Sequence, residues 1–163
     1  IDSKMPDQQA AYESILSNVL AALAGVDVIH DGVYGILESG MTASRAQFII
    51  CHEIVEMVER VARGIEVNDE TLALKVISKT GPGGDFLRQR HTLQHFKREH
   101  WIPRLTDRSP RSEWEQAGSK DVVERAEEEA ERILKTHQPE PLEKDVREEL
   151  EEFVKARAKE VGG

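Results

Sequence analysis

An imidazole, two carboxylates and a phenol follow closely on one short apolar run in this sequence. The run is VDVI at residues 26–29, and a segment broken by glycines then carries His30, Asp31, Tyr34 and Glu38. In parallel α/β folds, ligands bind at the carboxyl ends of strands. If residues 26–29 form a buried strand, the four side chains line one wall of a ligand site. An ordinary connection between a strand and a helix, with His30 bonded only to backbone, explains the same residues equally well.

Two helical patterns carry histidines that could bind a metal ion. His52, Glu53 and Glu56 resemble part of a zinc-hydrolase helix, but the second histidine of that motif is missing, and a zinc hydrolase needs three protein ligands. His91 and His95 lie four residues apart on one helical face and form half of a metal site. No cysteine or acidic cluster nearby completes it, so a structural or partner-facing role is the better explanation. The sequence therefore predicts no metal site.

The glycine-rich segment GPGG at residues 81–84 could let backbone amides approach a phosphate group. It lacks the glycine spacing of the known phosphate-binding loops, and it follows a helical pattern rather than a strand. A turn that ends a helix is the better explanation of these glycines.

Amphipathic helical patterns account for most of the rest of the chain. The first runs from a cap at Ser3 to Gly25, and its wide apolar face is typical of a helix that covers a sheet. The residues predicted for that face are Tyr12, Ile15, Leu16, Val19, Leu20 and Leu23. The later patterns begin at Thr42 or Ser44, Asn68, His91, Ser109, Lys120 and Leu142. The pattern from Thr42 or Ser44 ends at Gly64, and the pattern from Asn68 ends at Gly81. The last two patterns, from Lys120 and Leu142, are acidic, and we expect a helical hairpin that docks on another surface.

Residues 26–29 are the one clear strand candidate in the sequence. A lone buried strand leaves its backbone hydrogen-bonding groups unpaired, so it needs neighbouring strands. We therefore expect this chain to be the C-terminal piece of a larger α/β domain, or to obtain its strand partners from another chain.

Charge and composition argue against several classes of protein. The 163 residues carry a net charge of −9, which argues against general binding of nucleic acid. No apolar run reaches membrane-spanning length. The single cysteine, Cys51, makes a disulfide framework impossible and fits a reducing compartment such as the cytoplasm. Residues 88–111 differ, with seven basic and two acidic side chains, so this stretch could meet an anionic ligand or an acidic protein.

Five long segments together carry a resemblance to a known family. They are SKMPDQQAAYES, NVLAALAGVDVIHDGVYGILESGMT, RGIEVNDETLAL, GPGGDFLRQRHTLQHFKREHWIPRL and DRSPRSEWEQAG. They resemble the C-terminal third of the trimethylamine methyltransferase family, which includes glycine betaine methyltransferases and related quaternary-amine demethylases. The resemblance extends from Asp2 to about Lys159.

The resemblance implies an α/β fold in which this chain is the C-terminal portion of a (β/α)8 TIM barrel. Residues 1–107 would belong to the barrel and residues 108–163 would form a helical C-terminal extension, so the fragment itself is mostly helical. Enzymes of the family remove a methyl group from a methylated amine such as trimethylamine or glycine betaine. They pass it to the Co(I) corrinoid of a small partner protein, so the methyltransferase itself binds no cofactor directly.

On this resemblance, the polar residues that follow position 29 become candidates for substrate binding. A quaternary ammonium ion has no proton to lose, and aromatic faces and carboxylates hold such cations. Tyr34 would supply the aromatic face, and Glu38 or Asp31 would supply the charge. His30 would donate to the carboxylate of a betaine, and Gln47 would line the same wall.

The basic stretch at residues 88–111 would then contact the corrinoid protein or the phosphate of its cofactor, through His91, His95 and Arg98. A plain solvated helix explains this stretch as well. A truncated family member that cannot complete a barrel could instead be a non-catalytic helical interaction module. Alone, the chain would expose helix faces meant for missing strands, and we expect homo-oligomers to form through these faces.

Overall fold

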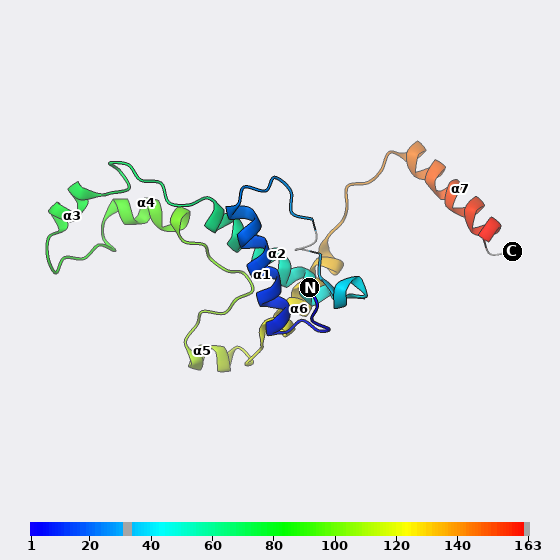
Figure 1. The fold of residues 1–163 in the computed structure, drawn as a ribbon, viewed down its shortest axis with the longest axis horizontal. Helices are drawn as coiled ribbons and strands as arrows, with labels where there is room; N and C mark the ends of the chain where they lie inside the picture. Colours follow the sequence, from blue (N-terminus) through cyan, green and yellow to red (C-terminus); the bar gives the residue numbers. More distant parts are fainter. Residues whose placement is uncertain (31–33, 162–163) are drawn as a thin grey trace. The chain divides into compact units, whose positions relative to one another are not determined.

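The computed structural model describes residues 1–30 and 34–161 of the chain. Ile1–Arg132 forms one compact unit and Ile133–Gly163 a second. Most described residues are helical, and none of the described helices is both long and apolar enough to cross a membrane (Figure 1). The elements are α1 (Gln8–Leu23), β1 (Ile36–Leu37), the 3-10 turn η1 (Glu38–Gly40), β2 (Thr42–Ala43), α2 (Arg45–Ala62), α3 (Leu74–Thr80), α4 (Arg90–Glu99), α5 (Arg111–Gln116), α6 (Val122–Thr136) and α7 (Lys144–Val161).

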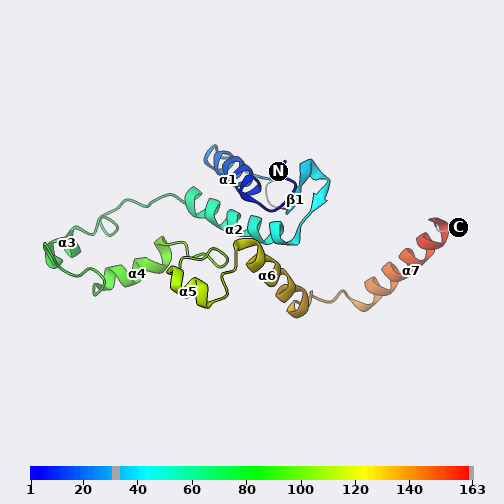
Figure 2. The ribbon, with the colours of Figure 1, turned by 90° about the horizontal axis from the view of Figure 1, so that it is seen from below.

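The core of the first unit is built on α2, whose apolar residues recur at every fourth position. α1 packs along α2, and α6 lies against it (Figure 2). Burial of one large apolar side chain contributes about 1.5–3 kcal/mol, so this stripe stabilises the unit. The buried core residues are Ala46, Ile50, Ile54 and Val58 of α2, Leu105 from the segment before α5, and Ala126 of α6.

Local capping residues set where α1 and α2 begin. Ser44 precedes α2, and its Oγ accepts a hydrogen bond from the Gln47 N–H at 3.2 Å, so of the two predicted caps, Thr42 and Ser44, the structure has Ser44. The predicted cap at Ser3 is wrong. Asp7 caps α1 instead, because its Oδ1 accepts a hydrogen bond from the Ala10 N–H at 3.0 Å.

Residues 26–29 do not form the predicted strand within the described chain. Val26 and Val28 are 51% and 76% exposed, and the segment follows α1 as irregular backbone. The strands of the described residues are β1 and β2, a short antiparallel ladder in which Ile36 pairs with Ala43. Because no strand lies beside residues 26–29 within the described part of the chain, their backbone has no ladder to join.

The predicted apolar face of α1 is mostly exposed. Leu16, Leu20 and Leu23 are 60%, 59% and 62% exposed, so this face covers no sheet within the described chain. The exposure agrees with a helix whose covering strands are missing. The buried residues of α1 are instead Ala10, Ser14 and Asn18.

Asn68 caps a turn rather than a helix. Its Oδ1 accepts hydrogen bonds from the Glu70 and Thr71 N–H groups, each at 2.9 Å. α3 begins only after Ala73, whose φ of 52° is left-handed. The predicted helix start at Asn68 is therefore wrong, whereas the predicted end at Gly81 is confirmed.

The second unit contains the end of α6 and the whole of α7. No described residue of α7 is buried, and Leu150, Phe153 and Val154 are 49%, 67% and 63% exposed. The predicted hairpin of the last two helices stays a prediction. The predicted division of the chain into residues 1–107 and 108–163 also stays a prediction.

Candidate functional site

His30 and Tyr34 face each other where the sequence predicts a wall of a ligand site. Their ring centroids lie 5.5 Å apart with an interplanar angle of 63°, which is an edge-to-face arrangement. Tyr34 is 45% exposed, so the pair presents aromatic surface to solvent that could hold a cation. Asp31, the predicted site residue between them, lies outside the described residues.

Glu38 follows β1 in a left-handed backbone conformation, with a φ of 52°. Its Oε2 accepts a hydrogen bond from Thr42 Oγ1 at 2.8 Å, and its N–H donates to the Ser3 carbonyl oxygen at 2.8 Å. The hairpin approaches α2 closely at Gly35, where a Cβ atom would lie 2.5 Å from the Phe48 nitrogen. Only glycine permits this approach. Glu38 is therefore an exposed carboxylate on a firmly anchored turn.

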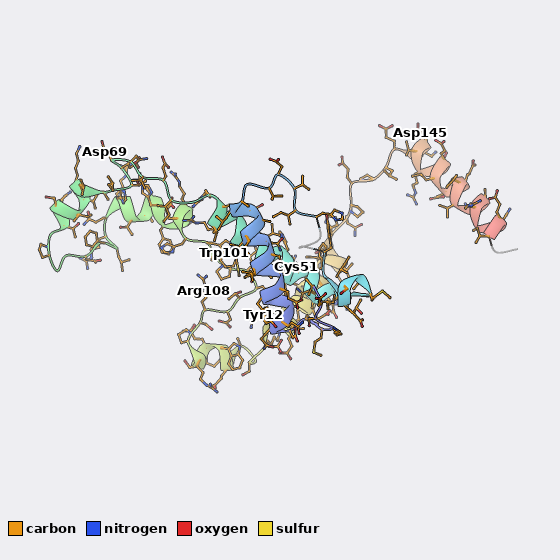
Figure 3. All side chains as sticks on the ribbon, viewed as in Figure 1. Tyr12, Cys51, Asp69, Trp101, Arg108 and Asp145 are labelled. Carbon is orange, nitrogen blue, oxygen red and sulfur yellow. The ribbon has the colours of Figure 1, made fainter. Side chains whose placement is uncertain are left out.

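Gln47 lies buried between α1 and α2. It is 1% exposed, and its Nε2 donates to Cys51 Sγ at 3.3 Å. Ser14 Oγ lies 3.9 Å from the same sulfur atom, and Figure 3 shows Cys51 at this helix interface. In the described residues Gln47 thus contributes to helix packing, and its role in substrate binding stays a prediction.

A pocket of about 470 Å³ adjoins the predicted wall and contains a carboxylate that the sequence did not single out. Glu13 lines this pocket together with Asp2 and with Ile29, the last residue of the predicted strand. The Gln9 side-chain amide, at 2.6 Å, and the N–H groups of Asp2 and Ser3 hold the pKa of Glu13 below its ordinary value. Glu13 therefore carries a negative charge beside the wall at neutral pH. Within the helical pattern nothing distinguished it from other polar positions.

The predicted partner-binding residues lie on α4 and contact the acidic segment before α3. The rings of His91 and His95 stack with centroids 4.2 Å apart. His95 Nε2 lies 3.3 Å from Glu70 Oε1, and His91 Nε2 lies 2.9 Å from the Glu70 carbonyl oxygen. Arg98 forms an ion pair with Glu66. These contacts hold the three side chains within the chain, and their contact with a partner stays a prediction.

No group of three or more His, Cys, Asp or Glu side chains within residues 1–30 and 34–161 could hold a metal ion. His52 is exposed, and the neighbouring Glu53 is buried with a structural task. Its Oε1 accepts hydrogen bonds from the N–H groups of Arg104 at 2.9 Å and Leu105 at 2.6 Å. Its Oε2 accepts from Thr106 Oγ1 at 2.7 Å. Glu53 therefore fixes the segment before α5 to α2.

The sequence model of the family described as trimethylamine methyltransferase (MTTB) matches residues 1–162 of the chain. The chain belongs to this family. It is 40% identical over 162 residues to the trimethylamine methyltransferase MttB of Desulfitobacterium hafniense (strain DSM 10664 / DCB-2), which covers 99% of this chain and 32% of that protein. It is 39% identical over 153 residues to the trimethylamine methyltransferase MttB of Methanosarcina barkeri, which covers 94% of this chain and 30% of that protein.

A family member with a different substrate in its name is nearly as similar. The chain is 38% identical over 162 residues to the glycine betaine methyltransferase of Desulfitobacterium hafniense (strain Y51), covering 99% of this chain and 33% of that protein. The chain thus spans about a third of the length of the curated relatives it matches. The family predicted from the five sequence segments is confirmed. The mostly helical structure with one two-stranded sheet is compatible with a part of a larger domain.

Proposed function

We propose that this chain is the C-terminal part of a methyltransferase that takes a methyl group from a tertiary or quaternary amine. The acceptor is the Co(I) corrinoid of a partner protein. The observation that carries the proposal is the family match over residues 1–162. The similar proteins are named for trimethylamine and glycine betaine, so these amines are the first substrates to test. The corrinoid acceptor and its carrier protein rest on the family resemblance alone.

The rest of such an enzyme would complete a (β/α)8 barrel against the exposed apolar surfaces of this chain. Leu16 and Leu20 of α1 are 60% and 59% exposed, and Val28 in the unpaired segment is 76% exposed. Burial of each such side chain contributes about 1.5–3 kcal/mol, so covering them would stabilise the larger domain. There residues 26–29 become a barrel strand, and the polar residues after them lie at its carboxyl end, where barrel enzymes bind substrate.

At that strand end, the residues of this chain have to hold the amine and exclude water. A quaternary ammonium ion offers neither a proton nor a lone pair, so its position relative to the acceptor is what the protein can control. His30 and Tyr34 offer aromatic surface, and Glu38 offers a negative charge. A corrinoid bound by the partner would supply the electron pair for the new bond to the methyl carbon, and the amine would leave with the electrons of the broken C–N bond.

A hybrid enzyme tests this function. In it, residues 1–163 replace the C-terminal third of the glycine betaine methyltransferase of Desulfitobacterium hafniense, with the rest of that protein unchanged. We expect methyl transfer from glycine betaine or trimethylamine to a Co(I) corrinoid. Glu38→Gln, which removes the charge and keeps the shape, should lower kcat/KM by about tenfold or more, because the amine loses its negatively charged partner.

The matched control for Glu38→Gln is Glu128→Gln, because Glu128 is an exposed carboxylate on α6. This control should keep its activity. A hybrid that folds but transfers no methyl group from either amine would contradict the methyltransferase function and would favour the non-catalytic interaction module. Unchanged kinetics in both Glu38→Gln and His30→Ala would contradict the proposed substrate wall while leaving the activity standing.

Contacts with other proteins form a further part of the proposal. The corrinoid protein would dock on α4 through His91, His95 and Arg98, and Arg98 keeps 53% of its side chain exposed for this contact.

Without the rest of the barrel, the chain would form homo-oligomers through the exposed face of α1. Light scattering of the isolated chain should report a mass above that of the monomer, and a clean monomer would contradict the oligomer.

A further inference from the structure

A cleft of about 480 Å³ lies between the second half of α2 and the end of α4 with the segment after it. The end of α4 is tied to α2, since Arg60 Nε donates to the Glu99 carbonyl oxygen at 2.9 Å. Among the predicted site residues that the structure describes, Arg98 lines this cleft and the others do not. Its lining residues are Glu56, Glu59, Arg60, Arg63, Lys97, Arg98, His100, Trp101, Ile102 and Arg104.

Three guanidinium groups at this cleft share one carboxylate. Arg60 and Arg63 reach Glu99 Oε2 at 3.1 and 3.4 Å, and Arg98 reaches its Oε1 at 3.3 Å. Arg60 is the least exposed of the three, with 23% of its side chain accessible. Because Arg98 also pairs with Glu66, two carboxylates face the three guanidinium groups, and one positive charge is left over in a fixed position.

Two further side chains of the cleft, Trp101 and Lys97, differ in accessibility. The Trp101 Nε1–H is buried, and no atom of the described residues accepts its hydrogen bond. The Trp101 ring lines the cleft, so the signal of this N–H group reports on a ligand that binds there. Lys97 lines the cleft without an ion pair to any described residue. Arg108 lies outside the cleft lining and adds a positive charge beside it, because its guanidinium carbon is 5.6 Å from the centre of the Trp101 ring (Figure 3).

Charge at the cleft is opposite in sign to that of the whole chain. Its lining carries five Arg and Lys side chains. Glu56 and Glu59 in the lining, and Glu66 and Glu99 as ion-pair partners, leave one positive charge uncompensated. The chain as a whole has a net charge of −9. A local excess of positive charge in an acidic protein attracts an anion to this place rather than to the surface at large.

We propose that this cleft binds the phosphate group of a phosphate ester. Its donors are the Lys97 ammonium group and four guanidinium groups. A tetrahedral phosphate has more acceptor oxygens to satisfy such a set than a planar carboxylate has. The ester is either a free phosphorylated small molecule or the phosphodiester in the nucleotide part of a corrinoid. The second source rests on the proposed function, whereas the phosphate site does not.

The Trp101 indole resonance in proton–nitrogen NMR of the full chain tests the site directly. Trp114 is an internal control, because its Nε1–H already donates to the Lys120 carbonyl oxygen at 2.9 Å. On titration with inorganic phosphate to about 10 mM, the Trp101 signal should shift and saturate with a Kd of about 1 mM or below. The Trp114 signal should stay in place. Trp101→Phe assigns the signal.

Lys97→Gln and Arg104→Gln should each weaken phosphate binding about tenfold, as the loss of one charge-assisted hydrogen bond does. Lys75→Gln is the matched control, since Lys75 is an exposed base on α3, and it should leave the Kd unchanged. A Trp101 signal that does not move, or that moves equally with sodium chloride at matched ionic strength, would overturn the proposal. So would equal weakening by all three substitutions.

Competition separates the two sources of the phosphate. If cobalamin displaces bound phosphate and cobinamide, which lacks the nucleotide phosphodiester, does not, the corrinoid is the source. If neither displaces it, the ligand is a free phosphate ester. The titration needs no methyl transfer, so an inactive hybrid enzyme would leave the phosphate site standing, and an unmoved Trp101 signal would leave the methyltransferase function standing.

Discussion

The helices α1 and α2 lie side by side, yet their apolar faces have opposite surroundings. Ile54 of α2 is 4% exposed, whereas Leu16 of α1 is 60% exposed. The neighbours of Ile54 come from Leu105 and from Ala126 of α6, all within this chain. Leu16 has the spacing of a core residue, but the described residues do not cover it. The difference separates a core that this chain builds by itself from a surface that we propose the rest of the enzyme covers.

The largest expected effect comes from truncating the two faces in the same way. Ile54→Ala should lower the free energy of unfolding by about 2–5 kcal/mol, because it leaves a cavity in the core. Leu16→Ala should change it by no more than about 0.5 kcal/mol in the isolated chain diluted until it is monomeric, because the side chain is then solvated. Urea unfolding followed by far-UV circular dichroism measures both. Equal losses in the two variants would erase the distinction between the faces.

Glu53 tests whether a buried polar side chain also stabilises the core that this chain builds by itself. Glu53→Gln replaces one acceptor oxygen by an amide that faces the Thr106 hydroxyl and the backbone donors of the 104–106 segment. We expect a loss of about 1–3 kcal/mol in the free energy of unfolding. The control Glu59→Gln, an exposed change on the same helix, should stay within about 0.5 kcal/mol. A Glu53→Gln variant as stable as this control would show that the hydrogen bonds of Glu53 to the 104–106 segment contribute nothing to the free energy of unfolding.

A smaller, pH-dependent effect is expected at the start of α1. The Ala10 N–H and the Ser3 hydroxyl hold the pKa of Asp7 below its ordinary value. A carboxyl with a depressed folded-state pKa stabilises the fold above its unfolded value of about 3.9 and loses that contribution as the pH falls through the folded value. The wild-type protein should therefore have a higher melting temperature than Asp7→Asn at neutral pH. When thermal unfolding is measured at successively lower pH, the two melting temperatures should converge near pH 2. A constant difference from pH 7 to pH 2 would contradict this.

Local signals made part of this structure predictable from the sequence. Ser44 as the cap of α2 and Gly81 as the end of α3 follow from the residue types at those positions. The edge-to-face contact of His30 with Tyr34 lies where the sequence placed a binding wall, although residues 26–29 are not the strand that was to position it. A strand depends on partners that hydrogen-bond to it, and no local pattern reports whether those partners are present.

Contacts between distant residues were not predictable. Glu53 contacts residues more than fifty positions later in the chain, and its neighbour His52 drew attention to metal binding instead. The pKa of Glu13 is lowered by Gln9 and by the backbone N–H groups of Asp2 and Ser3. The cleft lined by Trp101 is formed between α2 and the end of α4. These sites depend on tertiary packing, which single-residue types and spacing do not determine.

Amide hydrogen exchange of residues 26–29 tests most directly whether this segment is one element of a larger fold. In the isolated chain, these amides should exchange at nearly the rate of an unstructured peptide, because they join no ladder. In the hybrid enzyme they should be protected by a factor of about 100 or more, as expected for a paired barrel strand. Equal, fast exchange in a folded hybrid would contradict the proposal that the missing part of the enzyme pairs with this segment and completes the site beside it.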